Sequence, residues 1–234
     1  MKSREEVIKP GRFGTAVAAD QLRGLYDKHN EVLVCHEIPV DIVFIGDSIT
    51  LGWNVYAYFG RTGRFVVNRG IGGDISQYAR KRFEADVLQL KPQLAVIKIG
   101  VNNTFDLDHW VPGDRREPAD IRHRVVSDVA AMIAMAQEAG IVPVVCSVLP
   151  TVVDVNANTG RRNELIVEIN AGLRLAIEAA GGGVYVDYHA RLTGPDGRTL
   201  LPELAEDGVH LNVHGYDIMA AALRETLAEH GLEI

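Results

Sequence analysis

The sequence predicts a single α/β domain, a three-layer α/β/α sandwich in which helices cover both faces of a five-stranded parallel sheet. Short runs of aliphatic and β-branched residues recur along the 234-residue chain. Longer segments with apolar residues at helical spacing separate these runs. Strands that alternate with helices pair in parallel through right-handed crossovers, which leaves helices on both faces of the sheet.

Five segments are predicted strands, and the first is the clearest. It reads Val-Asp-Ile-Val-Phe-Ile over residues 40–45 and ends before Gly46, as expected of a buried strand in a parallel sheet. Pro92 precedes the third strand, and Pro143 lies near the start of the fourth, where a missing N–H is tolerated. The other four strands are expected at 65–68, 94–99, 141–148 and 184–186.

Helical patterns fill the intervals between the strands. In the first of them, Val17, Leu22 and Tyr26 repeat at helical spacing. Asp74 lies where the N-cap region of the second is expected, and Gly140 ends the third, as glycine often does. The five helices are expected at 15–30, 76–90, 119–139, 162–180 and 213–230. We expect the segment of about residues 1–38 to pack as an extra helix on one domain spanning 1–234.

The composition indicates one globular domain with a substantial core, because 47% of the residues are hydrophobic and 24% are charged. The formal charge of -7 argues against a nucleic-acid partner and against binding to an anionic membrane. No apolar stretch reaches the ~18 residues that a membrane span needs. Residues 1–14 are charged and lack the apolar core of a signal peptide, so we expect a cytoplasmic location.

The two cysteines, Cys35 and Cys146, lie beside apolar runs and are predicted to be buried thiols. A disulfide framework is not expected in a domain of this size with two cysteines. Their spacing is not that of a CxxC redox or zinc motif.

Four short segments, three of them directly after predicted strands, offer the groups of a hydrolytic site. The carboxyl ends of parallel strands meet at one edge of the sheet, where ligands bind. The segments are Gly46-Asp47-Ser48-Ile49, Gly70-Ile71-Gly72-Gly73-Asp74, Gly100-Val101-Asn102-Asn103 and Asp207-Gly208-Val209-His210.

Ser48, His210 and Asp207 have the residue types of a catalytic triad. A serine hydroxyl becomes a nucleophile when a base takes its proton, and a carboxylate three residues before His210 can orient the imidazole. Ser48 alone is equally well placed as a helix N-cap. Thr50 departs from the Gly-x-Ser-x-Gly motif of ordinary α/β-hydrolases.

A metal site is the other interpretation of this histidine, because His214 follows His210 by four residues. Leu211 occupies the position of the Glu in the His-Glu-x-x-His motif, so no metal is expected. An oxyanion hole can be assembled from the N–H groups of Ser48 and Gly73 and the side-chain amide of Asn102. Taken singly, the glycines and asparagines are also typical of turns and caps.

The four segments, in order, resemble the sequence blocks of the GDSL family, also called SGNH hydrolases. The similarity extends from about Val40 to the last helix, and residues 68–74 resemble the branch of the intracellular platelet-activating-factor acetylhydrolases. The resemblance implies a flavodoxin-like sheet order, no cofactor, a possible homodimer and a triad of Ser48, Asp207 and His210. It also implies Ser48, Gly73 and Asn102 as oxyanion donors. Asn103 departs from the Asp that many members carry.

Four further residues are candidate substrate contacts: Asp47, Trp53, Asn103 and Trp110. Aromatic rings can stack on a sugar or an acyl chain, although aromatic residues more commonly serve packing. In this family, Asp47 is usually a structural partner of neighbouring loops. Arg69, beside the Gly73 loop, is expected to be a solvated surface residue, with anion binding as the alternative.

We therefore expect a serine esterase that acts on a small ester through an acyl-enzyme, with an acetyl group on a carbohydrate as the first choice of substrate. One alternative is a lysophospholipase or thioesterase, which would cleave longer acyl chains. Another is a catalytically silent binding or assembly module. A nucleotide-binding domain is disfavoured, because the chain has no phosphate-binding glycine fingerprint and no Walker lysine.

Overall fold

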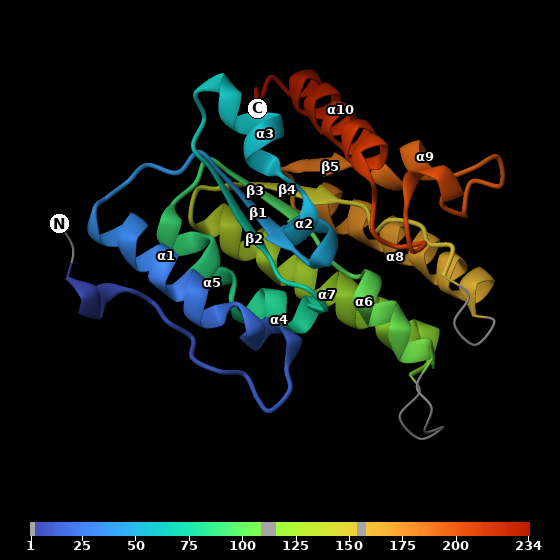
Figure 1. Cartoon of the computed structure of the whole chain (residues 1–234), viewed down its shortest axis with the longest axis horizontal. Helices are drawn as coiled ribbons and strands as arrows, with labels where there is room; N and C mark the ends of the chain where they lie inside the picture. The colour runs from blue at the N-terminus through green and yellow to red at the C-terminus, as the bar shows by residue number, and fades with distance from the viewer. Residues whose placement is uncertain (1–2, 109–115, 154–157) are drawn as a thin grey trace.

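The computed structural model describes residues 3–108, 116–153 and 158–234. Its centre is a five-stranded sheet in the order β2-β1-β3-β4-β5, with every neighbouring pair parallel (Figure 1). This flavodoxin-like order confirms the predicted fold class. The strands are β1 Ile42–Gly46, β2 Val66–Gly70, β3 Leu94–Lys98, β4 Val142–Cys146 and β5 Val184–Val186.

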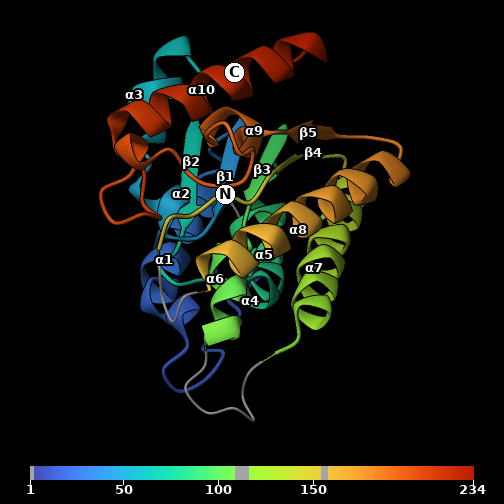
Figure 2. The same cartoon turned by 90° about the vertical axis from the view of Figure 1, so that its right-hand side faces the viewer.

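Helices cover both faces of the sheet (Figures 1 and 2). One face carries α2 Ser48–Gly52, α3 Val55–Phe59, α9 Tyr188–Leu192 and α10 Val213–Glu229. The other carries α1 Arg23–Cys35, α4 Ser76–Lys81, α5 Phe83–Asp86, α7 Pro118–Glu138 and α8 Thr159–Ala179. The short helix α6 Val101–Thr104 follows β3. Of the described helices, none is long and apolar enough to cross a bilayer.

The first helix differs from its prediction. The region expected to be helical from residue 15 contains a short 3-10 turn, Ala18–Gln21, and the α-helix begins only at Arg23. Ala16 has a φ of 61°, which no right-handed helix accommodates. The helix then continues to Cys35, beyond its expected end, and packs against α5. The described part of the N-terminal segment therefore contributes this helix to the domain.

The single helix expected at 76–90 is three short pieces. Helix α4 ends at Lys81, α5 covers Phe83–Asp86, and a 3-10 turn covers Leu88–Leu90. Arg82 and Val87, which separate the pieces, leave helical geometry. Arg82 is 0% exposed and directs its guanidinium to buried acceptors, so tertiary contacts interrupt the predicted helical pattern here.

The core is continuous across the sheet, and all five residues of β1 are buried. Val43, Phe44 and Ile45 are each at most 1% exposed. Burying such a side chain contributes roughly 1.5–3 kcal/mol each, which fixes β1 in the middle of the molecule. Cys35 and Cys146 are free and buried, as predicted.

Candidate active site

Ser48 begins helix α2 at the carboxyl end of β1. The turn is tight, because a Cβ on Gly46 would lie 2.2 Å from the carbonyl oxygen of Lys98 and 2.3 Å from Thr50 Oγ1. Asp47 is the N-cap, and its carboxylate accepts the N–H of Ile49 at 3.0 Å. The first N–H groups of a helix have no acceptor within it, which leaves the Ser48 N–H available to a ligand.

The hydroxyl of Ser48 meets the imidazole of His210, 162 positions further along the chain. His210 Nε2 lies 2.7 Å from Ser48 Oγ. On the other side of the ring, Nδ1 lies 2.6 Å from a carboxylate oxygen of Asp207. Ser48, His210 and Asp207 thus form one hydrogen-bonded chain, with the carboxylate fixing the orientation of the ring.

The surroundings of Asp207 favour the charged form of its carboxylate. Partial burial alone would raise its pKa, but the backbone N–H and imidazole of His210 and the N–H of Val209 outweigh that effect and lower the pKa to about 2. The two N–H groups donate at 2.7 and 3.0 Å. A permanently ionised carboxylate next to the ring stabilises an imidazolium, which forms when the ring accepts a proton.

Backbone contacts hold the segment that carries this pair. The N–H of Val152 donates to the carbonyl of Gly208 at 2.9 Å, and the N–H of Glu206 donates to the carbonyl of His210 at 3.2 Å. Gly208 has a φ of 81°, and a Cβ there would lie 3.1 Å from the backbone of Val152. The segment is at the surface, and the side chains of His210 and Asp207 are 48% and 55% exposed.

Gly73 lies in the loop after β2, and Asn102 lies in the short helix α6 after β3; these two strands stand on either side of β1. Gly73 has a φ of 72°, in the left-handed region that favours glycine. Asn102 donates one side-chain N–H to the backbone carbonyl of Asp74 at 2.9 Å. The amide has two N–H donors, so one remains for a ligand while the other ties α6 to the segment after Gly73.

Two of the predicted substrate contacts, Asp47 and Trp53, are buried and contact other protein groups, so the prediction is wrong for both. Asp47 is 0% exposed and forms an ion pair with Lys98 at 2.9 Å. Trp53 is 3% exposed and packs edge-on against Phe44 and in a stack on Tyr216. Burial of the Trp53 ring is favourable because the ring is apolar, whereas the buried charge of Asp47 needs the partner that Lys98 supplies.

Asn103 and Arg69 also differ from expectation. Asn103 is 3% exposed, and its oxygen accepts the N–H of Ser76 at 3.1 Å. Asn103 therefore caps α4 in place of Asp74, and it is not a substrate contact. Arg69 is 3% exposed and donates to Asn30, so it is neither solvated nor free to bind an anion. Trp110 lies outside the described residues.

Lys98 is a polar residue of this region that sequence reasoning missed. It stands in the run Leu-Ala-Val-Ile-Lys-Ile, and a lysine in a strand buried on both faces requires a buried anion. That signal was present in the sequence. Within the described residues, no group of three His, Cys, Asp or Glu side chains is arranged to hold a metal ion.

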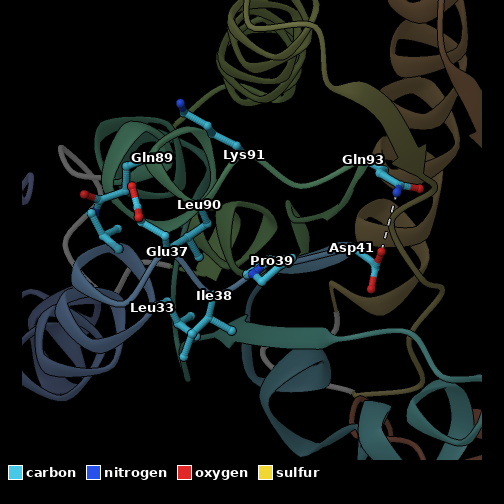
Figure 3. Close-up of a pocket in the computed structure, with 11 residues that line it drawn as sticks. Leu33, Glu37, Ile38, Pro39, Asp41, Gln89, Leu90, Lys91 and Gln93 are labelled. Carbon is cyan, nitrogen blue, oxygen red and sulfur yellow. Dashed lines mark hydrogen bonds between the residues drawn. The ribbon is translucent and has the colours of Figure 1, made fainter. Parts of the chain in front are cut away.

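A cavity of about 370 Å³ lies at the opposite edge of the sheet (Figure 3). Asp41 and Gln93, which line it, stand just before β1 and β3 begin. Among the described residues that line it, none is a serine, threonine, cysteine or histidine. The cavity thus lacks a nucleophile and base for acyl transfer, and it is separate from the site around Ser48.

A serine lies at the carboxyl edge of the parallel sheet and is hydrogen-bonded to a histidine–carboxylate pair. This fold and this site define a candidate acyl-transfer hydrolase. A model of the GDSL-like Lipase/Acylhydrolase family matches residues 44–218. The chain therefore belongs to the GDSL-like lipase and acylhydrolase family, which confirms the resemblance inferred from the four segments.

One curated relative, the uncharacterized lipoprotein YqeF of Bacillus subtilis (strain 168), is 28% identical over 126 residues. That match covers 48% of this chain and 49% of the relative, so the chain spans about half the length of the relative.

Solved structures share the fold over most of the chain. A proposed acylhydrolase of Bacteroides fragilis NCTC 9343 is 26% identical, with a TM-score of 0.73, covering 91% of this chain and 97% of that one. A candidate platelet activating factor of Streptococcus pneumonia is 24% identical, with a TM-score of 0.69, covering 91% and 94%. The acetylxylan esterase Axe2 of Geobacillus stearothermophilus is 20% identical, with a TM-score of 0.64, covering 84% and 97%.

Proposed function

We propose that this chain is a serine esterase that cleaves a small ester through an acyl-enzyme intermediate. One observation carries the proposal: Ser48 Oγ lies 2.7 Å from His210 Nε2, while Nδ1 of the same ring lies 2.6 Å from Asp207. This is the contact order that a nucleophile, its base and the orienting carboxylate need.

In the first half of the reaction, His210 Nε2 takes the proton of Ser48 as Oγ attacks the ester carbonyl carbon. Asp207 stabilises the imidazolium that results. The oxyanion is held by the N–H groups of Ser48 and Gly73 and the second amide N–H of Asn102. Nε2 then gives its proton to the leaving alkoxide, and an alcohol departs.

In the second half, a water molecule replaces the alcohol. His210 takes a proton from this water, whose oxygen attacks the acyl carbon of the Ser48 ester. Collapse of the second oxyanion breaks the bond to Oγ, which recovers a proton from His210. The products are a carboxylic acid and the free enzyme, and no cofactor enters the balance.

The substitution Ser48→Ala tests this proposal directly. It is expected to abolish turnover of p-nitrophenyl acetate while the far-ultraviolet circular dichroism spectrum stays unchanged. Ser127→Ala is a matched control, because Ser127 is exposed on α7, away from the carboxyl edge of β1. Undiminished turnover in Ser48→Ala would refute the mechanism.

A short acyl group, in particular an O-acetyl group on a carbohydrate, is the substrate class we propose. Ala18 Cβ lies 3.1 Å from where a Cβ on Gly73 would be, so the N-terminal segment narrows the space beside this loop. The acetylxylan esterase Axe2 is a structural neighbour, which supports the same choice. Release of acetate from a panel of acetylated sugars, compared with hydrolysis of acyl lipids, tests this choice.

The two alternatives predict different results. For a lysophospholipase or thioesterase, kcat/KM of p-nitrophenyl esters rises with chain length from acetate to octanoate, whereas our proposal predicts a fall. For a silent binding module, a fluorophosphonate probe leaves the folded protein unlabelled. Our proposal predicts stoichiometric labelling at Ser48 and none in Ser48→Ala.

A further inference from the structure

We propose that Arg82, which lies beneath the site and touches no substrate, is a positioning residue for the oxyanion hole. The inference rests on the proposed function, because it takes Gly73 and Asn102 as oxyanion donors and assigns Arg82 the role of holding both in place. Arg82 follows the loop of Gly73 by nine positions and interrupts the helical pattern after α4.

The guanidinium of Arg82 connects the ends of β1 and β2 to the segment that carries Gly73. Arg82 Nη2 donates to the carbonyl of Gly46 at 3.0 Å, two residues before Ser48. Nη1 donates to the carbonyl of Arg69 at 2.8 Å, near the end of β2. Nε donates to a carboxylate oxygen of Asp74 at 2.8 Å, directly after Gly73.

Through Asp74, the same contacts also reach helix α6, which carries Asn102. The side chain of Asp74 is bound to Arg82, and its backbone carbonyl accepts the Asn102 amide at 2.9 Å. Arg82 thus fixes the residue that follows Gly73 and that holds Asn102. Movement of Asp74 would displace both donors, and an oxyanion hole is sensitive to donor position.

Arginine is required here because all three nitrogens of the guanidinium contact acceptors in different parts of the fold. Nη1 also donates to Asp86 at 2.8 Å, and Nη2 also lies 2.8 Å from Asp74. A lysine has three donors on one atom, and it cannot reach acceptors arranged around a planar fork. Arg82, Asp74 and Asp86 are each 0% exposed, so water cannot replace a lost contact at low cost.

The test is a double-mutant cycle on p-nitrophenyl acetate with Arg82→Lys and Asn102→Ala. Arg82→Lys is expected to lower kcat by about 10- to 100-fold with KM changed less than about threefold. If the two side chains act on the same donor, their effects are not independent. The fold-loss of kcat in the combined variant is therefore expected to be smaller, by a factor of at least about five, than the product of the fold-losses in the two single variants. Arg80→Lys is the matched control, because Arg80 lies two residues earlier, in the last turn of α4, with a half-exposed side chain, and it is expected to keep the wild-type kcat.

A purely structural role would lower the folded fraction equally in both backgrounds, so multiplicative losses in the cycle would overturn the inference. A wild-type kcat in Arg82→Lys would overturn it as well. If Arg82→Lys fails to fold by circular dichroism, Asp74→Asn replaces it in the same cycle, because it keeps the backbone carbonyl and weakens the contact with Arg82. Activity in Ser48→Ala would instead overturn the proposed function, so the two failures are distinguishable.

Discussion

The ammonium group of Lys98 lies 2.9 and 3.1 Å from the two carboxylate oxygens of Asp47, the residue directly before Ser48. Lys98 is 3% exposed and Asp47 is 0% exposed. Burial lowers the pKa of Lys98, and the carboxylate of Asp47 opposes that effect. Because Asp47 also caps α2, this buried pair anchors the helix turn on which Ser48 stands.

Lys98→Met is expected to destabilise the protein by about 3–5 kcal/mol, since it leaves the charge of Asp47 buried without its partner. Lys98→Met combined with Asp47→Asn is expected to be more stable than Lys98→Met alone, because the asparagine oxygen can still cap α2 without a charge. Urea unfolding at pH 7 measures both free energies. A double variant no more stable than Lys98→Met would contradict the ion-pair explanation.

Gly73→Ala is expected to reduce kcat on p-nitrophenyl acetate by more than about tenfold, through displacement of an oxyanion donor. The φ of 72° costs a non-glycine residue roughly 1–2 kcal/mol, and the new Cβ would lie 3.1 Å from Ala18. Gly72→Ala is the control, because a Cβ there meets no atom within 4 Å. Equal activity in the two variants would exclude a special role for the Gly73 conformation.

Asp207→Asn is expected to lower kcat strongly and to reduce stability in a pH-dependent way. The folded-state pKa of Asp207 is lowered from 3.8 to about 2, against the partial burial that would raise it, mainly by the N–H and imidazole of His210. A lowered carboxylate pKa stabilises the fold above pH 4, and this contribution fades as pH falls through about 2.

The melting temperature of wild type should therefore exceed that of Asp207→Asn by more at pH 6 than at pH 2.5. The difference is expected to be small, because the side chain is 55% exposed and solvent screens its charge. The same difference at both pH values would mean that the charge of Asp207 does not contribute to stability.

Much of the fold could be predicted from sequence because its signals are local. Each strand is a short apolar run, and all five predicted strands overlap the observed ones. The break at Arg82 could not be predicted, since it depends on acceptors in β1 and β2 that helical periodicity does not report. The left-handed Ala16 shortened α1 at its start for a reason that is likewise not visible in periodicity.

For the site, the order of the motifs located the residues around Ser48. The spacing of the motifs did not distinguish side chains that face the site from buried side chains that hold it in place. Asp47 and Asn103 adjoin Ser48 and Asn102 in sequence, yet both side chains are directed into the protein. The local conformation at the start of α2 and in α6 decides which neighbour faces the edge of the sheet, and this conformation depends on the folded chain. Lys98 and Arg82 are the residues of this support that the sequence analysis did not single out.

His210 stands on a surface segment held by a few backbone hydrogen bonds, whereas Ser48 is anchored to the centre of the sheet. Segments of this kind open at a lower free energy than the core does. In rising denaturant, the imidazole would then part from the hydroxyl while the sheet is still intact. Catalysis in this protein would thus be lost before global unfolding. The enzymatic rate would therefore fall at a lower denaturant concentration than any spectroscopic signal from the sheet.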